Sequence, residues 1–125
     1  MKVQQKTNKR TEADTATLGS GNVFADLGFP PKEAAELKVK ADLAMQIYQR
    51  IKELGLTQVR AADRLGLSQP DVSKIMAGRH GGFSVERMLS LLSALEVDVD
   101  IVVRPKTRGR KFRLGTVRVM DAAPA

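Results

Sequence analysis

The stretch from Gln58 to Ile75 constrains the fold of this chain more than any other part of its sequence. Its pattern predicts two short helices, over residues 58–65 and 69–77, joined by a tight turn. Two helices that cross at about 90–120° need a small residue where they touch, a glycine that turns left-handed between them, and aliphatic side chains that seat the second helix. The residues that meet these needs are Ala62, Gly66, Val72 and Ile75. Their spacing is that of a helix-turn-helix.

Residues suited to helix ends support this motif, which we place at residues 57–77. Thr57 is the predicted N-cap of the first helix, and Ser68 is that of the second, with Asp71 completing a capping-box pattern. Pro70 fits the first turn, where N–H groups have no partner within the helix. Any two packed helices joined by a glycine would share some of these features, and such a purely structural pair is the alternative interpretation.

Helices are also predicted on both sides of the motif. Pro31 can open a helix, and an apolar stripe then runs at helical spacing as far as Gly55, which predicts a helix over residues 31–54. Ser84 is the predicted N-cap of another helix, over residues 85–95, which has one broad apolar face. The expected fold class is therefore mostly α, with a bundle of four to five helices.

The hydrophobic period changes after Glu96. Apolar residues alternate with polar ones, which predicts a half-buried β-strand over residues 97–103, and a second β-like run spans residues 112–120. Because an isolated strand leaves its backbone unpaired, the first strand must pair with this run, as a hairpin, or with its counterpart in a second copy of the chain. We favour the second arrangement, in which the C-terminal β-strand serves dimerisation. The apolar residues expected at that interface are Leu92, Leu95, Val97, Val99 and Ile101.

Composition excludes several classes of site. The chain has no cysteine, which excludes disulfides, thiolate zinc sites and cysteine nucleophiles, and its one histidine, His80, lies in a glycine-rich turn. We therefore expect no catalytic residues, no metal site and no cofactor, and a protein that is not an enzyme. Five aromatic residues predict an aliphatic core and are too few for a surface that stacks single-stranded bases, which leaves duplex DNA as a partner.

The net charge of +7 is unevenly distributed along the chain. A basic surplus is typical of a protein with a negatively charged partner. Residues 56–82, which contain the motif, carry +2, and residues 83–103 carry −3. Residues 104–125 carry seven basic residues and one acidic residue, a net charge of +6. Most of the surplus therefore lies in a C-terminal segment, for which a solvated tail is the simplest interpretation.

The motif resembles the helix-turn-helix domains of the Cro and phage-repressor (XRE) superfamily. More narrowly, several stretches together resemble HigA-type antitoxins: Asn22 to Gly28, Leu43-Ala44, Leu56-Thr57-Gln58, Leu67-Ser68-Gln69, Phe83-Ser84 and Val97 to Ile101. The resemblance covers about residues 21–104. It implies a lambda-repressor-like fold and a homodimer that binds operator DNA, often with a RelE/HigB-like ribosome-dependent ribonuclease toxin as partner. The basic stretch after Arg104 is not part of the family pattern.

On this basis the chain has three parts. Residues 1–21 are polar and predict a flexible N-terminal arm, residues 22–104 form the expected DNA-binding and dimerisation domain, and residues 105–125 are a basic C-terminal extension. No apolar signal region follows the basic N-terminus, and no stretch approaches the roughly 18 apolar residues of a membrane span. We therefore expect a cytoplasmic protein without membrane contact.

The second helix of such a motif enters the major groove, where its first residues face the edges of the bases. Gln69 can bond an adenine and Lys74 a guanine, and each good contact gives about 1–3 kcal/mol of discrimination. Gln58, matched to the first position of the family motif, is the expected phosphate contact at the start of its helix. The residues expected to contact DNA are Gln58, Ser68, Gln69, Pro70, Ser73, Lys74 and Arg79.

The sequence therefore predicts a sequence-specific repressor of double-stranded DNA with a palindromic operator, whose half-sites lie about 34 Å apart. The favoured hypothesis is the antitoxin of a type II toxin-antitoxin operon, which regulates its own promoter and neutralises a toxin through a flanking segment. The first alternative is a stand-alone phage-type XRE regulator without a toxin partner. A protein-interaction module that does not bind DNA is the second.

Overall fold

The computed structural model describes residues 21–106, 109, 111–112 and 114–122, and these contain five helices. The helices are α2 (Val23–Asp26), α3 (Pro31–Glu53), α4 (Gln58–Leu65), α5 (Gln69–Met76) and α6 (Val85–Ala94). The four helices predicted from the sequence are confirmed, with ends that differ by no more than one residue. The described residues divide into two compact units, one that ends at Lys38 and one that begins at Val39. Residues 1–20, most of the predicted N-terminal arm, lie outside the described residues.

The one-turn helix α2, in the first unit, is not predicted by the sequence pattern. Asn22 is its N-cap, because the side-chain oxygen accepts hydrogen bonds from the backbone N–H groups of Phe24 (2.9 Å) and Ala25 (3.2 Å). The side-chain nitrogen of Asn22 donates to the carbonyl oxygen of Ala34 at 3.0 Å. The rings of Phe24 and Phe29 meet edge to face, with 6.1 Å between their centroids. One asparagine thus starts α2 and ties it to the first turn of α3.

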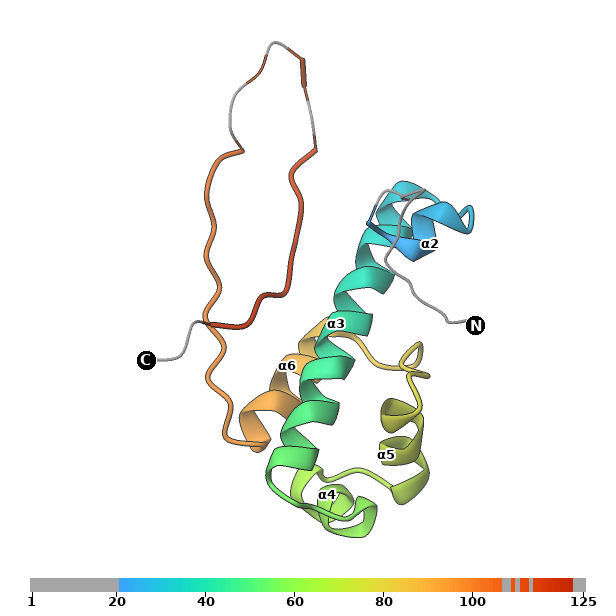
Figure 1. The fold of residues 1–125 in the computed structure, drawn as a ribbon, viewed down its shortest axis with the longest axis vertical. Coiled ribbons are helices and arrows are strands. Elements are labelled where there is room, and N and C mark those ends of the chain that lie inside the picture. The colour runs from blue at the N-terminus through green and yellow to red at the C-terminus, as the bar shows by residue number, and fades with distance from the viewer. Residues whose placement is uncertain (1–20, 107–108, 110, 113, 123–125) are drawn as a thin grey trace, which may run out of the picture. The chain divides into compact units, whose positions relative to one another are not determined.

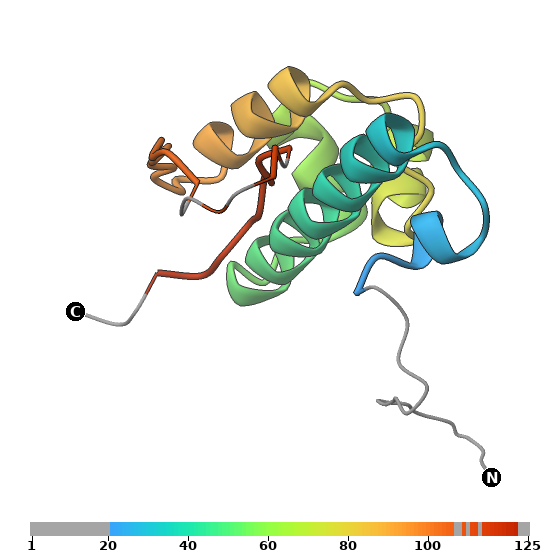
Figure 2. The same cartoon turned by 90° about the horizontal axis from the view of Figure 1, so that it is seen from above.

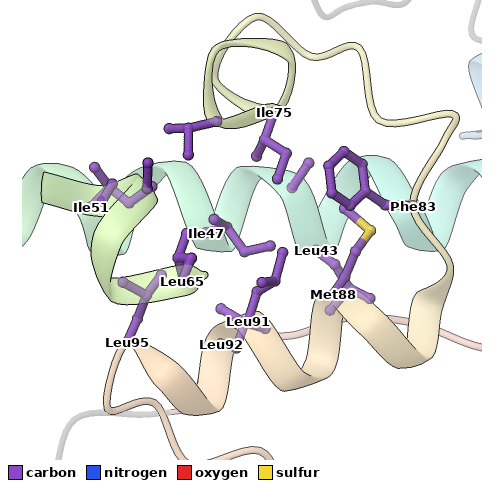
Figure 3. Packing of buried hydrophobic residues seen from close by; sticks show 14 of the residues in the cluster. Leu43, Ile47, Ile51, Leu65, Ile75, Phe83, Met88, Leu91, Leu92 and Leu95 are labelled. Carbon is purple, nitrogen blue, oxygen red and sulfur yellow. The ribbon is translucent and has the colours of Figure 1, made fainter. Parts of the chain in front are cut away.

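The second unit folds around an aliphatic core. Helix α3 contributes Leu43, Ile47 and Ile51, whose spacing of four residues places them on one stripe of the helix. Figure 3 shows these side chains meeting others from α4, α5, α6 and the residues that flank α6. The labelled partners are Leu65, Ile75, Phe83, Met88, Leu91, Leu92 and Leu95. Each fully buried side chain of this size contributes roughly 1.5–3 kcal/mol.

Figure 1 shows α3 as the axis of this second unit, with α4, α5 and α6 arranged around its C-terminal half. This arrangement leaves one side of α5 free, because its other side is packed into the core. In the part of the chain that the structure describes, no helix is both long and apolar enough to cross a membrane.

The predicted C-terminal β-strand is wrong. Neither residues 97–103 nor the described part of 112–120 forms a strand, and the described residues contain no sheet. A strand exists only through hydrogen bonds to a neighbouring strand. Here the N–H of Val97 donates to the carbonyl oxygen of Leu92 at 3.1 Å, which completes the end of α6 rather than starting a ladder. The apolar alternation therefore yields chain without regular secondary structure in the described part of residues 97–122, and we call this range the C-terminal arm.

Contacts with α3 fix both ends of the C-terminal arm. Just before the arm begins, Arg50 donates from Nε to the carbonyl oxygen of Leu95 at 2.9 Å. Near its end, Gln46 donates from Nε2 to Oδ1 of Asp121 at 2.6 Å, and Val119 packs against the core. Between these points the arm leaves the end of α6 and returns toward α3 (Figure 1). The arm is thus attached at two points, and the described residues from Asp98 to Arg118 between them are exposed.

Candidate nucleic-acid interface

Three consecutive residues, Gly66, Leu67 and Ser68, form the turn between α4 and α5. Gly66 has φ +67° and ψ +32°, the left-handed conformation that glycine adopts without steric cost. The N–H of Leu67 donates to the carbonyl oxygen of Ala62 at 3.0 Å, which closes α4. Oγ of Ser68 accepts from the N–H of Asp71 at 3.2 Å, which opens α5. The direction of α5 is therefore set by local hydrogen bonds on both sides of the turn.

Helix α5 has one buried and one exposed face. Val72 and Ile75 point into the core and are almost fully buried. At 3.6 residues per turn, positions 69, 70, 73 and 74 share the other face. Of the predicted contacts, the structure brings the following together at the start and on the outer side of this helix: Ser68, Gln69, Pro70, Ser73 and Lys74, of which Ser73 is half-buried and the rest are exposed.

The exposed face of α5 combines several kinds of hydrogen-bonding group. Gln69 offers an acceptor and two donors, Ser73 offers a hydroxyl, and Lys74 offers an ammonium group. Nζ of Lys74 lies 3.8 Å from Oδ1 of Asp71. An exposed ion pair of this kind is worth only about 0–1 kcal/mol, so Lys74 can exchange Asp71 for another acceptor at little cost. This mixture suits the donor and acceptor patterns along base edges in a major groove.

The two remaining predicted contacts flank this face. Gln58 is the first residue of α4 and is half-buried. It follows Thr57, whose Oγ1 accepts from the N–H of Arg60 at 3.1 Å, while other N–H groups of this first turn have no partner within the helix. Arg79 is exposed in the loop after α5. Both positions can meet a phosphate, Gln58 at the positive end of a helix dipole and Arg79 through its guanidinium.

His80, next to Arg79, differs from these residues because it is only 8% exposed. Burial lowers the pKa of His80 below the ordinary value of 6.5, and the positive charge of Lys40 lowers the pKa further. Its Nδ1 has no hydrogen-bond partner among the described residues. A neutral, buried ring does not attract a phosphate, so His80 belongs to the packing of the loop. No group of three or more His, Cys, Asp or Glu side chains in the described chain could hold a metal ion.

Two exposed arginines of α4, Arg60 and Arg64, are missing from the sequence prediction. They are one turn apart, on the side away from the buried Ala61 and Leu65, and this spacing was the available signal. They border a shallow, open hollow lined by Leu56, Val59, Arg60, Asp63 and Arg64. Because the first helix of a helix-turn-helix crosses the DNA backbone, both arginines are further candidates for phosphate contact.

The residues predicted for a dimer interface fall into two groups. Leu92 and Leu95 are 2% and 0% exposed in the core, so packing within the chain already uses them, and Val97 is half-buried against that core. Val99 and Ile101 are 41% and 75% exposed on the C-terminal arm. Further exposed apolar residues follow at Val102 and Val103. A second chain could therefore meet the exposed group but not the buried one.

Comparisons with known proteins agree with this geometry. A family model described as a helix-turn-helix domain matches residues 23–104. A solved structure named as a candidate XRE family transcriptional regulator is 40% identical in sequence, with a TM-score of 0.66. That similarity covers 72% of this chain and 99% of the other chain. No curated protein matches the sequence.

Proposed function

The chain belongs to the helix-turn-helix family, as a DNA-binding transcriptional regulator of the XRE type, and we propose that it is a sequence-specific repressor that reads its operator with the exposed face of α5. The observation that carries this proposal is the placement of Gln69 and Lys74 on the free side of a helix whose other side is buried. A helix already held by its cap and the core loses little conformational freedom on binding. Its contacts can therefore contribute fully to discrimination between sequences.

The test uses an operator selected in vitro from random duplex DNA. The double variant Gln69→Ala/Lys74→Ala is expected to lose about 1–3 kcal/mol of preference for the selected site per contact removed. The matched control is Gln49→Ala/Lys52→Ala, which removes the same residue types from exposed positions of α3 and should keep the full preference. Circular dichroism checks the fold of both. An α5 variant that folds and retains the wild-type preference would rule out this role for α5.

We also propose that the repressor is a homodimer that binds a palindromic operator. The support is the run of exposed apolar side chains on the C-terminal arm, because a second chain that covers Ile101 and Val103 removes apolar area from water. The acidic charge of residues 83–103 would oppose contact with DNA and fits a surface that faces away from it.

Sedimentation equilibrium at micromolar concentration tests the dimer. The variant Val103→Asp should shift the wild-type dimer toward monomer, since it places a charge among apolar side chains at the interface. Val59→Asp, at an exposed position of α4, is the matched control and should leave the dimer intact. A wild-type protein that sediments as a monomer contradicts the dimer without affecting the role of α5.

We propose further that the protein is the antitoxin of a type II toxin-antitoxin operon. It acts in the cytoplasm by binding DNA and a toxin, without catalysing a reaction. The support is the resemblance of the stretch from Asn22 to Gly28, together with flanking segments that could fold on a toxin. A toxin gene beside this one, whose product co-purifies with the protein and whose growth arrest it relieves, is the expected result. If neither the gene nor the co-purifying toxin is found, the stand-alone phage-type regulator replaces the antitoxin.

A further inference from the structure

Most of the net positive charge lies outside the matched domain. The family match ends at residue 104, and residues 105–125 carry six basic residues and one acidic residue, a net charge of +5, whereas residues 56–82 around the motif carry +2. The basic surplus is therefore an addition to the common domain, and the structure places it on the C-terminal arm.

The described basic side chains of the C-terminal arm are exposed to solvent. The described ones are Arg104, Lys106, Lys111 and Arg118. None forms an ion pair with another described residue, whereas Arg50 on α3 pairs with Glu53 at 3.2 Å. The one acidic residue of the segment, Asp121, accepts a hydrogen bond from Gln46 instead. Arg108, Arg110 and Arg113 lie outside the described residues.

Sequence spacing keeps two of these charges close together. Arg104 and Lys106 are separated by one residue, so their Cα atoms lie no more than about 7 Å apart. One strand of duplex DNA carries a phosphate about every 3.4 Å along its axis, so the two charges span about two phosphate steps. Phe112 is 87% exposed beside Lys111. An exposed aromatic ring among cations can pack against sugars or a base step.

The position of the C-terminal arm keeps its contacts separate from those of α5. Figures 1 and 2 show the arm and α5 on opposite sides of α3. The nine residues from Asp98 to Lys106 can span at most about 30 Å when fully extended, which limits how far from α6 the first cations of the arm can lie. Asp98 and Asp100, at the base of the arm, are repelled by DNA, so contact begins at Arg104.

We propose that the C-terminal arm is a second DNA-binding element, which contacts duplex phosphates outside the α5 site through Arg104, Lys106, Lys111 and Arg118. The inference rests on the proposed function, since α5 is what brings a duplex within reach. Contacts to phosphates strengthen binding to every sequence alike and leave discrimination to α5. An anionic membrane would attract the same charges, but the adjoining domain belongs to a DNA-binding family, and the test separates the two partners.

The experiment measures the affinity of the full chain for a 30-base-pair duplex of mixed sequence as a function of salt. Each lost phosphate contact lowers the slope of log K against log salt by about 0.9. The variant Lys106→Gln/Lys111→Gln should lower this slope by about 1.8. Adding Arg104→Gln and Arg118→Gln should bring the total decrease in slope to about 3.6. The matched control, Lys32→Gln/Lys52→Gln, removes two exposed lysines of α3 and should keep the wild-type slope.

Each outcome distinguishes the two proposals. If the wild-type chain binds the duplex and the arm variants share its slope, the arm does not contact DNA, while the role of α5 stands. If the wild-type chain binds neither this duplex nor a selected operator, the proposed function fails and this inference fails with it. Phosphatidylserine vesicles are the second probe: arm-dependent binding to them, with an unchanged DNA slope, would assign the arm to a membrane surface and overturn the inference.

Discussion

The α4–α5 motif and the C-terminal arm are both marked by clear sequence patterns, but only the motif has the structure that its pattern predicts. In the motif, Ser68 and Gly66 form hydrogen bonds with residues no more than four positions away along the chain. Ile75 packs in the core. In the arm, the alternation from Val97 to Val103 requires a second strand edge, which the described chain does not supply. Helix caps and turns thus form through hydrogen bonds to nearby residues, whereas a strand forms only when a neighbouring strand pairs with it.

The largest expected contrast is between two leucines. Leu65 of α4 is 9% exposed and Leu114 of the arm is 71% exposed. Leu65→Ala should lower the free energy of unfolding by about 2–5 kcal/mol, because it leaves a cavity in the core. Leu114→Ala should change it by no more than about 0.5 kcal/mol. Urea unfolding measures both, and equal losses would show that the arm is packed in solution.

The next contrast is between two glycines, and it isolates the effect of backbone conformation on stability. A methyl group added at Gly66 or at Gly115 would meet no atom within 4 Å, but only Gly66 has a positive φ, of +67°. Gly66→Ala should therefore destabilise the fold by about 1–2 kcal/mol. Gly115→Ala should be neutral or stabilise by up to about 1 kcal/mol, through the unfolded state. Thermal unfolding compares the variants, and a neutral Gly66→Ala would break the argument that the turn requires a left-handed residue.

A smaller contrast concerns hydroxyl groups. Oγ of Ser68 accepts a hydrogen bond from a helix N–H, whereas Thr116 is exposed on the arm and makes no hydrogen bond with a described residue. Ser68→Ala should cost about 1 kcal/mol of stability as the N-cap is lost, and Thr116→Ala should leave stability unchanged. Melting temperatures of the two variants check this. Ser68→Asn, which can also cap a helix, should retain most of the stability.

The smallest effect is the pH dependence due to His80. The pKa of His80 in the folded chain lies below 6.5. Between that lowered pKa and pH 6.5, the unfolded chain therefore binds a proton at His80 that the folded chain does not bind. His80 therefore adds stability above pH 6.5, and this contribution is lost as the pH falls from 6.5 through the lowered pKa. The urea concentration at the unfolding midpoint should decrease as the pH is lowered from 7.5 to 5.5, and this decrease should be smaller in His80→Gln. Identical pH profiles would show that His80 is solvated, like the charged groups of the arm.

Sequence reasoning recovered the helices α3 to α6 and the outward face of α5, because caps, glycines and apolar period act within a few residues. It missed α2, although Asn22 is a strong N-cap residue, because a helix of one turn has no measurable period. It also missed the bond from Arg50 to Leu95, since the two residues lie 45 positions apart. Nothing in the pattern around Arg50 marks it as a support for the end of α6.

By itself, the sequence determined that this chain forms a helix-turn-helix with Gln69 at the start of its second helix and Lys74 in the last turn of that helix, and that most of its net positive charge follows residue 104. Only the tertiary structure decided which apolar residues are available to a partner. Leu92 and Leu95 are buried in the core of the chain itself, while Ile101 is exposed on the C-terminal arm. The reason is physical: a helix satisfies its own backbone hydrogen bonds, whereas burial and strand pairing depend on what the rest of the chain brings alongside.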